Sequence, residues 1–325
     1  MAKILYITYD FNFKKTGSSR FFYDYLCENF EVDTISPDAE NTIPYEQINE
    51  KDYTAIISFY FYADFSKIKC PNKIFVPMYD GFAFSFKKVQ ELQNVKVINF
   101  CLYFHKLCKL FGLKSFYIKY YPELEYQQTE RDKLFYWQRR ETSFSKISKC
   151  FSDNVADIGI KSTILHSATD GSQKFFPPTE EEKRKFNITI TNWFENKDDL
   201  IKLLDQSKYY IAPRKQEGIG LSFLDAMSHG CVIIAHNDCT MNEYIQNGVN
   251  GYLVDFDNPQ KIDFKDFDKI QKESIKRVEE GVQAYNEALI ILKDFIKDEN
   301  CKSNFLRSKM VSFLYFGLKK VFHKN

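Results

Sequence analysis

The segment 209–235 reads Tyr-Tyr-Ile-Ala-Pro-Arg-Lys-Gln-Glu-Gly-Ile-Gly-Leu-Ser-Phe-Leu-Asp-Ala-Met-Ser-His-Gly-Cys-Val-Ile-Ile-Ala, and its order predicts the fold class. An apolar, β-prone run ends at Pro213, an apolar stripe at helical spacing follows Gly220, and Gly230 precedes a second apolar run. A strand, a helix and another buried strand in this order form the repeating unit of a parallel α/β sheet.

The same alternation of apolar β-prone runs and helical stretches extends over most of the chain. We predict a first series of strands at 3–9, 53–59, 73–78, 95–100 and 115–120, and a second series at 133–137, 162–166, 187–191, 209–212, 231–235 and 251–254. A polar stretch at 122–132 separates the two series. The sequence therefore predicts two doubly wound Rossmann-like domains, at 1–125 and 126–263, followed by C-terminal helices at 264–325. A ligand is expected in the cleft between the two domains.

The composition is that of a globular protein and argues against several classes of function. The 45 basic and 44 acidic side chains leave a net charge of +1, which argues against a nucleic acid partner. The eight cysteines include no Cys-x-x-Cys pair, so neither a zinc site nor a disulfide scaffold is predicted. No stretch approaches the length of a membrane span, and no signal-like apolar run precedes Asp10, so we expect a cytoplasmic protein.

The loop between the strand and the helix of the opening segment has the features of a ligand site. Gly218 and Gly220 allow a ligand to approach the backbone closely, and the N–H groups at a helix start suit a phosphate or a sugar hydroxyl. Glu217 and Asp225 could then bind different parts of one ligand. A Gly-x-Gly pair also occurs in ordinary tight turns between a strand and a helix, so the pair alone leaves both interpretations open.

The spacing Glu217-x7-Asp225 resembles the Glu-x7-Glu mark of GT-B glycosyltransferases of the group 1 (family 4-like) type, with Asp in place of the second Glu. The resemblance continues through 240–254 and through 134–140, where the family has a strand that ends in a phosphate-binding Arg. The N-terminal domain matches in patches, and these resemble a branch that assembles bacterial surface polysaccharides such as O-antigen or capsule. A GT-B fold is therefore expected, with two domains facing a cleft and C-terminal helices returning across it.

The resemblance implies how the donor, a nucleotide-diphosphate sugar, is bound. Asp225 would accept hydrogen bonds from the ribose hydroxyls, directly or through a water, because Asp is one methylene shorter than Glu. Glu217 would hold the donor sugar together with the backbone of Gly218, Ile219 and Gly220.

The diphosphate is expected to lie beside basic side chains that follow the strand at 133–137. Arg139 would neutralise it and stabilise it as it leaves, and Lys146 is the nearest candidate for the lysine that assists in the family. Arg140 is an equally basic neighbour, and an interdomain salt bridge is the alternative role for Arg139. Arg214 and Lys215 are interpreted as charges at the rim of the loop.

Three further residues are candidates on weaker grounds. The loop around Gly17 lies where the family brings a glycine backbone near the donor phosphates, although the usual double glycine is missing. Asp80 follows a predicted strand and is the candidate to bind the acceptor hydroxyl or to assist its deprotonation; a simple turn residue is the alternative. His166 ends a predicted donor-domain strand and is expected either to line the sugar site or to be a packed structural histidine.

The reaction implied is transfer of the sugar to a carbohydrate acceptor, expected to be lipid-linked, with retention of configuration and without a metal or cofactor. The Asp-x-Asp triplets at 255–257 and 266–268 do not lie where the resemblance puts the phosphates, so we interpret them as solvated acids. A catalytically inactive nucleotide-sugar-binding or partner subunit is one alternative. A GT-B epimerase or phosphorylase is another.

The C-terminal tail, 301–325, has an unusual composition. It contains six basic residues and no Asp or Glu, interleaved with apolar and aromatic residues. A helix of this kind can lie on an anionic membrane surface, and it can equally pack back onto the N-terminal domain. Both roles are compatible with the sequence.

Overall fold

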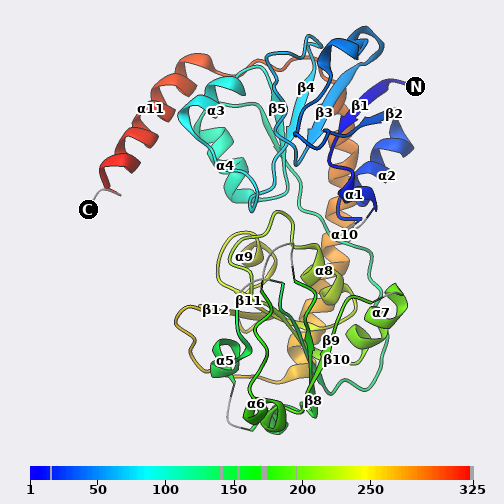
Figure 1. Cartoon of the computed structure of the whole chain (residues 1–325), viewed down its shortest axis with the longest axis vertical. Helices are drawn as coiled ribbons and strands as arrows, with labels where there is room; N and C mark the ends of the chain where they lie inside the picture. Colours follow the sequence, from blue (N-terminus) through cyan, green and yellow to red (C-terminus); the bar gives the residue numbers. More distant parts are fainter. Residues whose placement is uncertain (15–16, 140–141, 152–153, 170–173, 195, 323–325) are drawn as a thin grey trace. The chain divides into compact units, whose positions relative to one another are not determined.

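The computed structural model of the chain describes residues 1–14, 17–139, 142–151, 154–169, 174–194 and 196–322. The chain forms two compact units, one comprising Met1–Lys119 with Tyr285–Asn325 and the other Tyr120–Ala284. Each unit is built on one six-stranded parallel sheet with helices beside it (Figure 1). The division after 125 and 263 expected from the sequence differs from these units, because the last long helix contributes residues to both of them.

In the first unit the strands lie in the order β2-β1-β3-β4-β5-β6, and neighbouring strands are parallel. Their bounds are Lys3–Ile7 (β1), Glu31–Ile35 (β2), Ala55–Phe59 (β3), Lys73–Val76 (β4), Lys96–Asn99 (β5) and Ser115–Tyr117 (β6). The chain reverses the direction in which it adds strands between β1 and β3. Such a switch point is where α/β sheets commonly bind ligands.

The sequence analysis missed one strand, β2, which lies at the edge of the first sheet beside β1. Its residues alternate between charged and less polar side chains and form no apolar run. Lys3 Nζ lies 3.2 Å from Glu31 Oε1 and 3.0 Å from Asp33 Oδ2, so ion pairs across the two strands support the register. An edge strand with one exposed face does not need the hydrophobic pattern that identifies buried parallel strands.

In the second unit the order is β12-β11-β10-β7-β8-β9, again with parallel neighbours. The bounds are Lys133–Trp137 (β7), Ser162–His166 (β8), Ile188–Thr191 (β9), Ser207–Ala212 (β10), Val232–His236 (β11) and Gly251–Val254 (β12). After β9 the chain crosses back to place β10 beside β7, which makes this pair the switch point of the second sheet. The two parallel sheets confirm the predicted doubly wound architecture.

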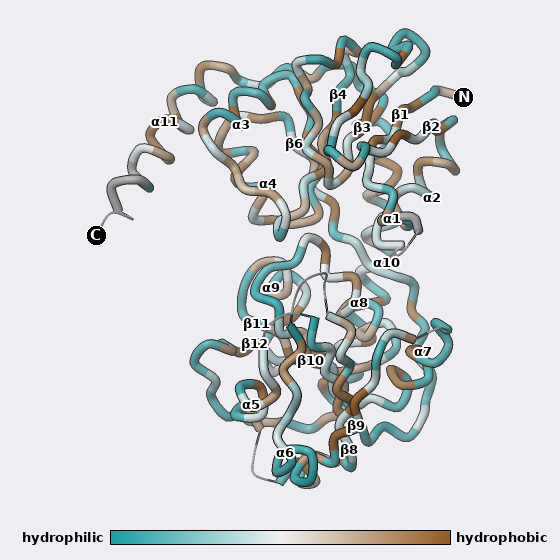
Figure 2. The backbone as a smooth tube through the Cα atoms, viewed as in Figure 1, coloured by the Kyte–Doolittle hydropathy of each residue, from teal (hydrophilic) through white to brown (hydrophobic). Residues whose placement is uncertain are grey.

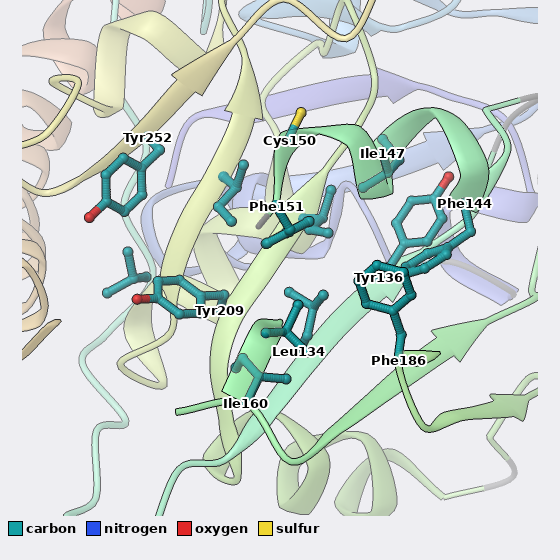
Figure 3. Packing of buried hydrophobic residues seen from close by; sticks show 14 of the residues in the cluster. Leu134, Tyr136, Phe144, Ile147, Cys150, Phe151, Ile160, Phe186, Tyr209 and Tyr252 are labelled. Carbon is teal, nitrogen blue, oxygen red and sulfur yellow. The ribbon is translucent and has the colours of Figure 1, made fainter. Parts of the chain in front are cut away.

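One face of the second sheet covers a cluster of fully buried side chains, shown in Figure 3. The cluster takes inward-facing residues from the central strands and packs them against the short helical segments that follow β7. Its labelled members include Leu134, Tyr136, Phe144, Ile147, Cys150, Phe151, Tyr209 and Tyr252. Figure 2 shows that the apolar residues lie mainly along the strands, while the connecting loops are polar.

The helices of the first unit are α1 (Phe11–Lys14), α2 (Arg20–Asn29), η1 (Tyr45–Gln47), η2 (Glu50–Asp52), α3 (Phe86–Glu91), α4 (Leu102–Leu110) and α11 (Phe305–Phe322). Those of the second unit are α5 (Phe144–Ile147), η3 (Ser148–Cys150), η4 (Val155–Ile158), α6 (Glu180–Lys185), α7 (Lys197–Asp205), α8 (Leu221–Ser228) and α9 (Met241–Tyr244). Helix α10 (Phe267–Lys297) contributes to both units. In the described part of the chain, no helix combines the length and the apolar character needed to cross a membrane.

The end of α10 packs onto the first unit, as expected for C-terminal helices that return to the N-terminal domain. Asn72 donates a hydrogen bond of 2.8 Å from Nδ2 to the carbonyl of Ile296, and the Tyr25 hydroxyl donates one of 2.8 Å to the carbonyl of Leu289. The Lys96 side chain is fully buried in β5, and its Nζ donates to the carbonyls of Phe295, Ile296 and Asp298. A helix leaves its last four carbonyls without partners inside the helix, so this ammonium group supplies a C-terminal cap.

Burial lowers the pKa of Lys96 to about 8, because the charged ammonium group is less stable away from water. In Lys96→Met the apolar part of the side chain keeps its packing, but carbonyls at the end of α10 lose their hydrogen-bond donor. We therefore expect this variant to be less stable by about 1–3 kcal/mol. Urea or thermal unfolding measures the change. Lys114→Met is the matched control, because Lys114 Nζ contacts Asp298 Oδ2 of the same turn near the surface and should cost less than ~1 kcal/mol. Equal losses in the two variants would contradict the capping role of Lys96.

Candidate functional site

The residues predicted to bind the donor follow the two strands that meet at the switch point of the second sheet. In the β7–β10 pair, Phe135 lies opposite Tyr210, and Tyr136 lies opposite Ile211. Arg139 lies two residues after the end of β7, and the loop that contains Glu217 comes directly after β10. Because the strands are parallel, their carboxyl ends meet at the same edge of the sheet. The topology therefore brings together residues that are far apart in the sequence.

The loop from β10 turns into α8 at Gly220, which has a φ of +89°. A Cβ atom at this position would lie 2.0 Å from Cε1 of Phe223, so both the backbone conformation and the space require glycine. The N-cap residue, Gly220, has no side chain that could cap α8, and the first turn of α8 carries no acidic residue. The predicted role of this helix start, to receive phosphate or hydroxyl groups, stays a prediction.

A buried ion pair lies inside the loop. Arg214 Nη1 is 2.9 Å from Glu217 Oε2, and both side chains are more than 90% buried. The hydroxyl of Thr240 donates a hydrogen bond of 2.7 Å to the carbonyl of Glu217 and ties the loop to the region after β11. The interpretation of Arg214 as a rim charge is wrong, because a buried carboxylate needs a charged partner and Arg214 supplies it. Lys215, in contrast, is exposed and pairs with Asp257.

Arg139 is held in place by the aromatic side chain two residues before it. Its Cζ lies 5.0 Å from the centre of the Trp137 ring, at cation–π distance, and its side chain is half-buried. Stacking on the ring restricts the orientation of the guanidinium. Arg140, the alternative phosphate ligand, lies outside the described residues.

Tyr210 is a residue that the sequence analysis did not assign to the site. It is buried in β10, and its ring stacks on Phe135 with centroids 5.4 Å apart and planes at 7°. Its phenol also hydrogen-bonds Ser222 of α8. Burial raises the pKa of Tyr210, the positive charge of Arg139 opposes this, and the negative charges of Glu217 and Asp225 add to it.

Three of the predicted donor-binding residues therefore act electrostatically on one phenol. Only the alternation of side chains along β10, read together with the strand order, could have indicated Tyr210 from the sequence.

Asp225 lies on α8 with a solvent-accessible side chain, although protein atoms crowd its surroundings. Desolvation by these surroundings raises the pKa of Asp225, and the positive charges of Lys197 and His229 partly oppose the increase. Burial, with a further contribution from the charge of Asp225, raises the pKa of Tyr120. A carboxylate that remains accessible in a crowded place can accept hydrogen bonds from a ligand's hydroxyl groups.

Gln138 is a second residue whose role the sequence did not indicate. Its backbone N–H donates a hydrogen bond of 2.9 Å to the carbonyl of His166. Its side chain is fully buried. Within the described structure, neither its Nε2 nor its Oε1 has a hydrogen-bond partner. A buried amide without partners is unfavourable for folding. A polar residue directly after an apolar strand was the available signal.

His166 ends β8 and is buried. Its Nδ1 lies 2.9 Å from Thr191 Oγ1, and its ring stacks on Phe194 with centroids 4.7 Å apart. Burial lowers the pKa of His166 to about 4, so the ring is neutral at pH 7. These contacts are those of a packed structural histidine, and a role in the sugar site stays a prediction.

Lys146 lies on α5, with its Nζ 2.8 Å from Asp257 Oδ1. The hydrogen bonds from Lys146 and Lys215 lower the pKa of Asp257 to about 2. Among the described residues, His236, Asp255 and Asp257 have ligand atoms within 4.8 Å of one another, as a metal site would require. Two ammonium groups on Asp257 compete with a cation, so this arrangement is a surface ion-pair cluster.

Gly17 and Asp80 belong to the first unit. Gly17 has a φ of +58°, and its carbonyl accepts a hydrogen bond of 3.0 Å from Arg20 at the start of α2. Asp80 is half-buried in the turn after β4, where the N–H of Gly81 bonds to the carbonyl of Met78. Both lie in loops at the carboxyl side of strands, and their predicted roles stay predictions.

The raised pKa of Asp225 makes a prediction about stability. Folding disfavours the charged form of this carboxylate. The stabilisation that protonated Asp225 gives the folded state is therefore fully present below the ordinary pKa of the group, and it is lost as the pH rises through the pKa in the folded state. We therefore expect Asp225→Asn to raise the thermal unfolding temperature at pH 7, with a difference that shrinks at acidic pH. Asp257→Asn is the control with the opposite sign, since the pKa of Asp257 is lowered. A less stable Asp225→Asn variant at pH 7 would contradict the pKa shift.

Comparison with known sequences identifies a domain in the second unit. The family described as Glycosyl transferases group 1 matches residues 171–283. The chain is 29% identical over 82 residues to an uncharacterized 41.2 kDa protein in the cps region of Klebsiella pneumoniae. It is 36% identical over 84 residues to a sucrose synthase of Melioribacter roseus. These segments are 25% and 22% of this chain and span only 23% and 11% of the two relatives.

Solved structures share the fold over most of the chain. A glycosyltransferase from Rickettsia africae matches with a TM-score of 0.60 at 14% identity, covering 92% of this chain and 98% of that one. A sucrose-phosphate synthase from Thermosynechococcus elongatus matches with a TM-score of 0.55 at 11% identity, over 100% of both chains. Anabaena HepE, solved in complex with UDP-glucose, matches with a TM-score of 0.54 at 11% identity, over 98% of this chain and 100% of its own. This chain therefore has the GT-B fold and carries a Glycosyl transferases group 1 domain in its second unit.

Proposed function

We propose that this chain is a glycosyltransferase that moves a sugar from a nucleotide-diphosphate sugar to a carbohydrate acceptor. The observation that carries the proposal is the position of three residues at the switch point of the second sheet: Arg139 follows β7, and Glu217 and Asp225 follow β10, its parallel neighbour. A cation after one strand and two carboxylates after the next suit a ligand that carries both a diphosphate and hydroxyl groups. The matching group 1 domain supports this proposal.

In the proposed complex, Asp225 binds the ribose and Glu217 binds the donor sugar. A carboxylate offers about four acceptor positions, so Glu217 can hold a sugar hydroxyl while Arg214 neutralises its charge. The buried ion pair would then orient Glu217 before the donor arrives. The backbone at 218–220 supplies further groups for the donor sugar.

Arg139 is proposed to bind the diphosphate and to stabilise the charge that develops as the bond to the sugar breaks. Lys146 and Gly17 are weaker candidates for phosphate contacts, and His166 for a contact with the sugar. We propose retention of configuration, in which the departing diphosphate takes the proton of the attacking acceptor hydroxyl. Such a reaction needs no strong side-chain base, and Asp80 would assist by binding that hydroxyl.

We further propose that the acceptor is lipid-linked and that the chain works in bacterial surface-polysaccharide assembly, in the cytoplasm and peripherally at the membrane. The relative named for a cps region supports the pathway. The composition of the C-terminal tail supports the location.

Release of nucleoside diphosphate from a panel of UDP-, GDP-, ADP- and dTDP-sugars, with lipid-linked acceptors, tests the proposal. Thermal shifts with the same panel identify the donor, because selective binding stabilises the folded state. Stabilisation by one donor without any turnover would instead support the alternative, an inactive nucleotide-sugar-binding or partner subunit. The replacement of the family's second Glu by Asp225 is what motivates this alternative.

Arg139→Ala should lower kcat/KM by about 10²-fold or more, the loss typical of removing one group that stabilises developing charge. Steady-state release of nucleoside diphosphate measures the effect. Arg184→Ala is the matched control, because it removes the same guanidinium from an exposed position on α6 of the same unit. If Arg139→Ala is fully active and Arg140→Ala is inactive, the phosphate ligand is Arg140.

Turnover should persist in excess EDTA, because the proposed phosphate site uses a guanidinium and Asp257 is paired with Lys146 and Lys215. The same nucleotide-release assay measures it with and without the chelator. Loss of activity in EDTA that Mg²⁺ or Mn²⁺ restores would show that the diphosphate is bound through a metal.

A further inference from the structure

Helix α11 presents its polar and apolar residues in an unusual way. Ser308 and Ser312 are fully buried, while Leu306, Met310 and Phe313 are 69%, 58% and 67% exposed. A surface helix of a water-soluble protein normally turns its apolar side toward the core. Helix α11 instead carries apolar side chains on both sides: Tyr315 and Phe316 pack on the buried Phe111, while the three residues above face the solvent.

The buried contacts show why the serines face inward. Gln90 on α3 donates from Nε2 to Ser312 Oγ at 3.2 Å, and Gln93, just after α3, donates to Ser308 Oγ. These hydrogen bonds fix the rotation of α11 on the first unit. Because they select the serine side for docking, the apolar residues on the opposite side are left in the solvent.

The exposed apolar residues form one continuous stripe. Leu306, Met310, Phe313 and Leu314 occupy positions i, i+4, i+7 and i+8, which share one face of a helix. Phe305 is also 60% exposed. Figure 2 shows apolar segments along this helix at the edge of the first unit. A contiguous apolar surface of this kind is typical of an interaction site. We call these five residues the α11 stripe.

A groove of about 660 Å³ lies where the end of α11 meets the start of α3. Its walls are largely aromatic, and lysines stand among the lining residues. They include Phe84, Phe86, Lys87, Phe313, Phe316 and Lys319. The groove therefore combines an apolar interior with cations, as a lipid chain and its anionic headgroup would require.

The charge of the helix selects between possible partners. Lys302, Arg307, Lys309 and Lys319 are exposed, and the sequence 301–325 contains no acidic residue. Two copies of the α11 stripe would bring these cations together and repel. An anionic bilayer instead attracts them, while its acyl boundary accepts the apolar side chains.

We propose that the α11 stripe and the adjoining groove dock the first unit on an anionic membrane surface. This inference deepens the proposed function, since a membrane surface is where a lipid-linked acceptor would be found, and it rests on that function for its biological purpose. The physical contact itself depends only on the residues of α11 and α3.

Co-sedimentation of the full chain with vesicles of phosphatidylcholine, or of phosphatidylcholine and phosphatidylglycerol in equal parts, tests the proposal. We expect binding to the anionic vesicles, weakened by salt and at least about tenfold weaker to neutral ones. Leu306→Gln/Met310→Gln/Leu314→Gln should reduce partitioning by about tenfold or more, because three exposed apolar side chains no longer enter the bilayer. Lys309→Glu/Lys319→Glu should reduce binding to the anionic vesicles alone.

The matched control is Ile290→Gln/Ile291→Gln, which changes two side chains on α10 that are 70% and 61% exposed and should leave vesicle binding unchanged. Unfolding temperatures of all variants verify that they are folded. Equal binding of the parent to both kinds of vesicle, or unchanged binding of the triple variant, would overturn the proposal. A concentration-dependent dimer of the parent that the triple variant abolishes would also overturn it, because a second copy would then cover the stripe.

A second readout separates this proposal from the proposed function. Thermal shifts with nucleotide sugars should be the same for the parent and the triple variant, because α11 and the donor residues belong to different units. Vesicle binding without any nucleotide-sugar binding would contradict the glycosyltransferase and leave the docking surface standing. Donor turnover without vesicle binding would contradict the docking surface and leave the glycosyltransferase standing.

Discussion

The parallel pairing of β7 with β10 is the constraint on which the candidate site depends. These strands are separated by two other strands in the sequence but are neighbours in the sheet, and their register places Phe135 opposite Tyr210. Hydrogen bonds of the ladder and the stacked rings hold the carboxyl ends of both strands at one edge. Every group proposed to bind the diphosphate or the donor sugar in the second unit is placed relative to this pair.

Several polar groups near this edge lie in surroundings that screen them from solvent. The ion pair between Arg214 and Glu217 is buried inside the loop that follows β10. Desolvation disfavours the charge of Asp225, and the amide of Gln138 has no partner among the described residues. The unpaired amide and the desolvated carboxylate cost folding free energy, and in the proposed complex the ribose would offset part of the cost at Asp225 by donating hydrogen bonds. Polar groups that are unfavourable for folding are expected at positions where a protein binds a ligand.

The C-terminal helices illustrate the same principle in the first unit. Lys96 is buried so that its ammonium can cap α10, and paired glutamines orient α11 through serines. The second arrangement leaves an apolar stripe in the solvent, which the hydrophobic effect disfavours unless another surface covers it. The face of α11 that packs on the protein is thus set by hydrogen bonds to Ser308 and Ser312 together with the contacts of Tyr315 and Phe316 with Phe111.

The sequence alone determined the class of the fold, because buried parallel strands must be apolar runs and their alternation with helices is visible along the chain. It also determined which loop follows β10 and that Gly220 begins a helix there, since the pattern of glycines and apolar residues is local. The edge strand β2, the inward position of Arg214 and the role of Tyr210 were not predictable in this way. Burial, charge pairing and the rotation of a helix depend on neighbours distant in sequence, and only the tertiary structure brings those neighbours together.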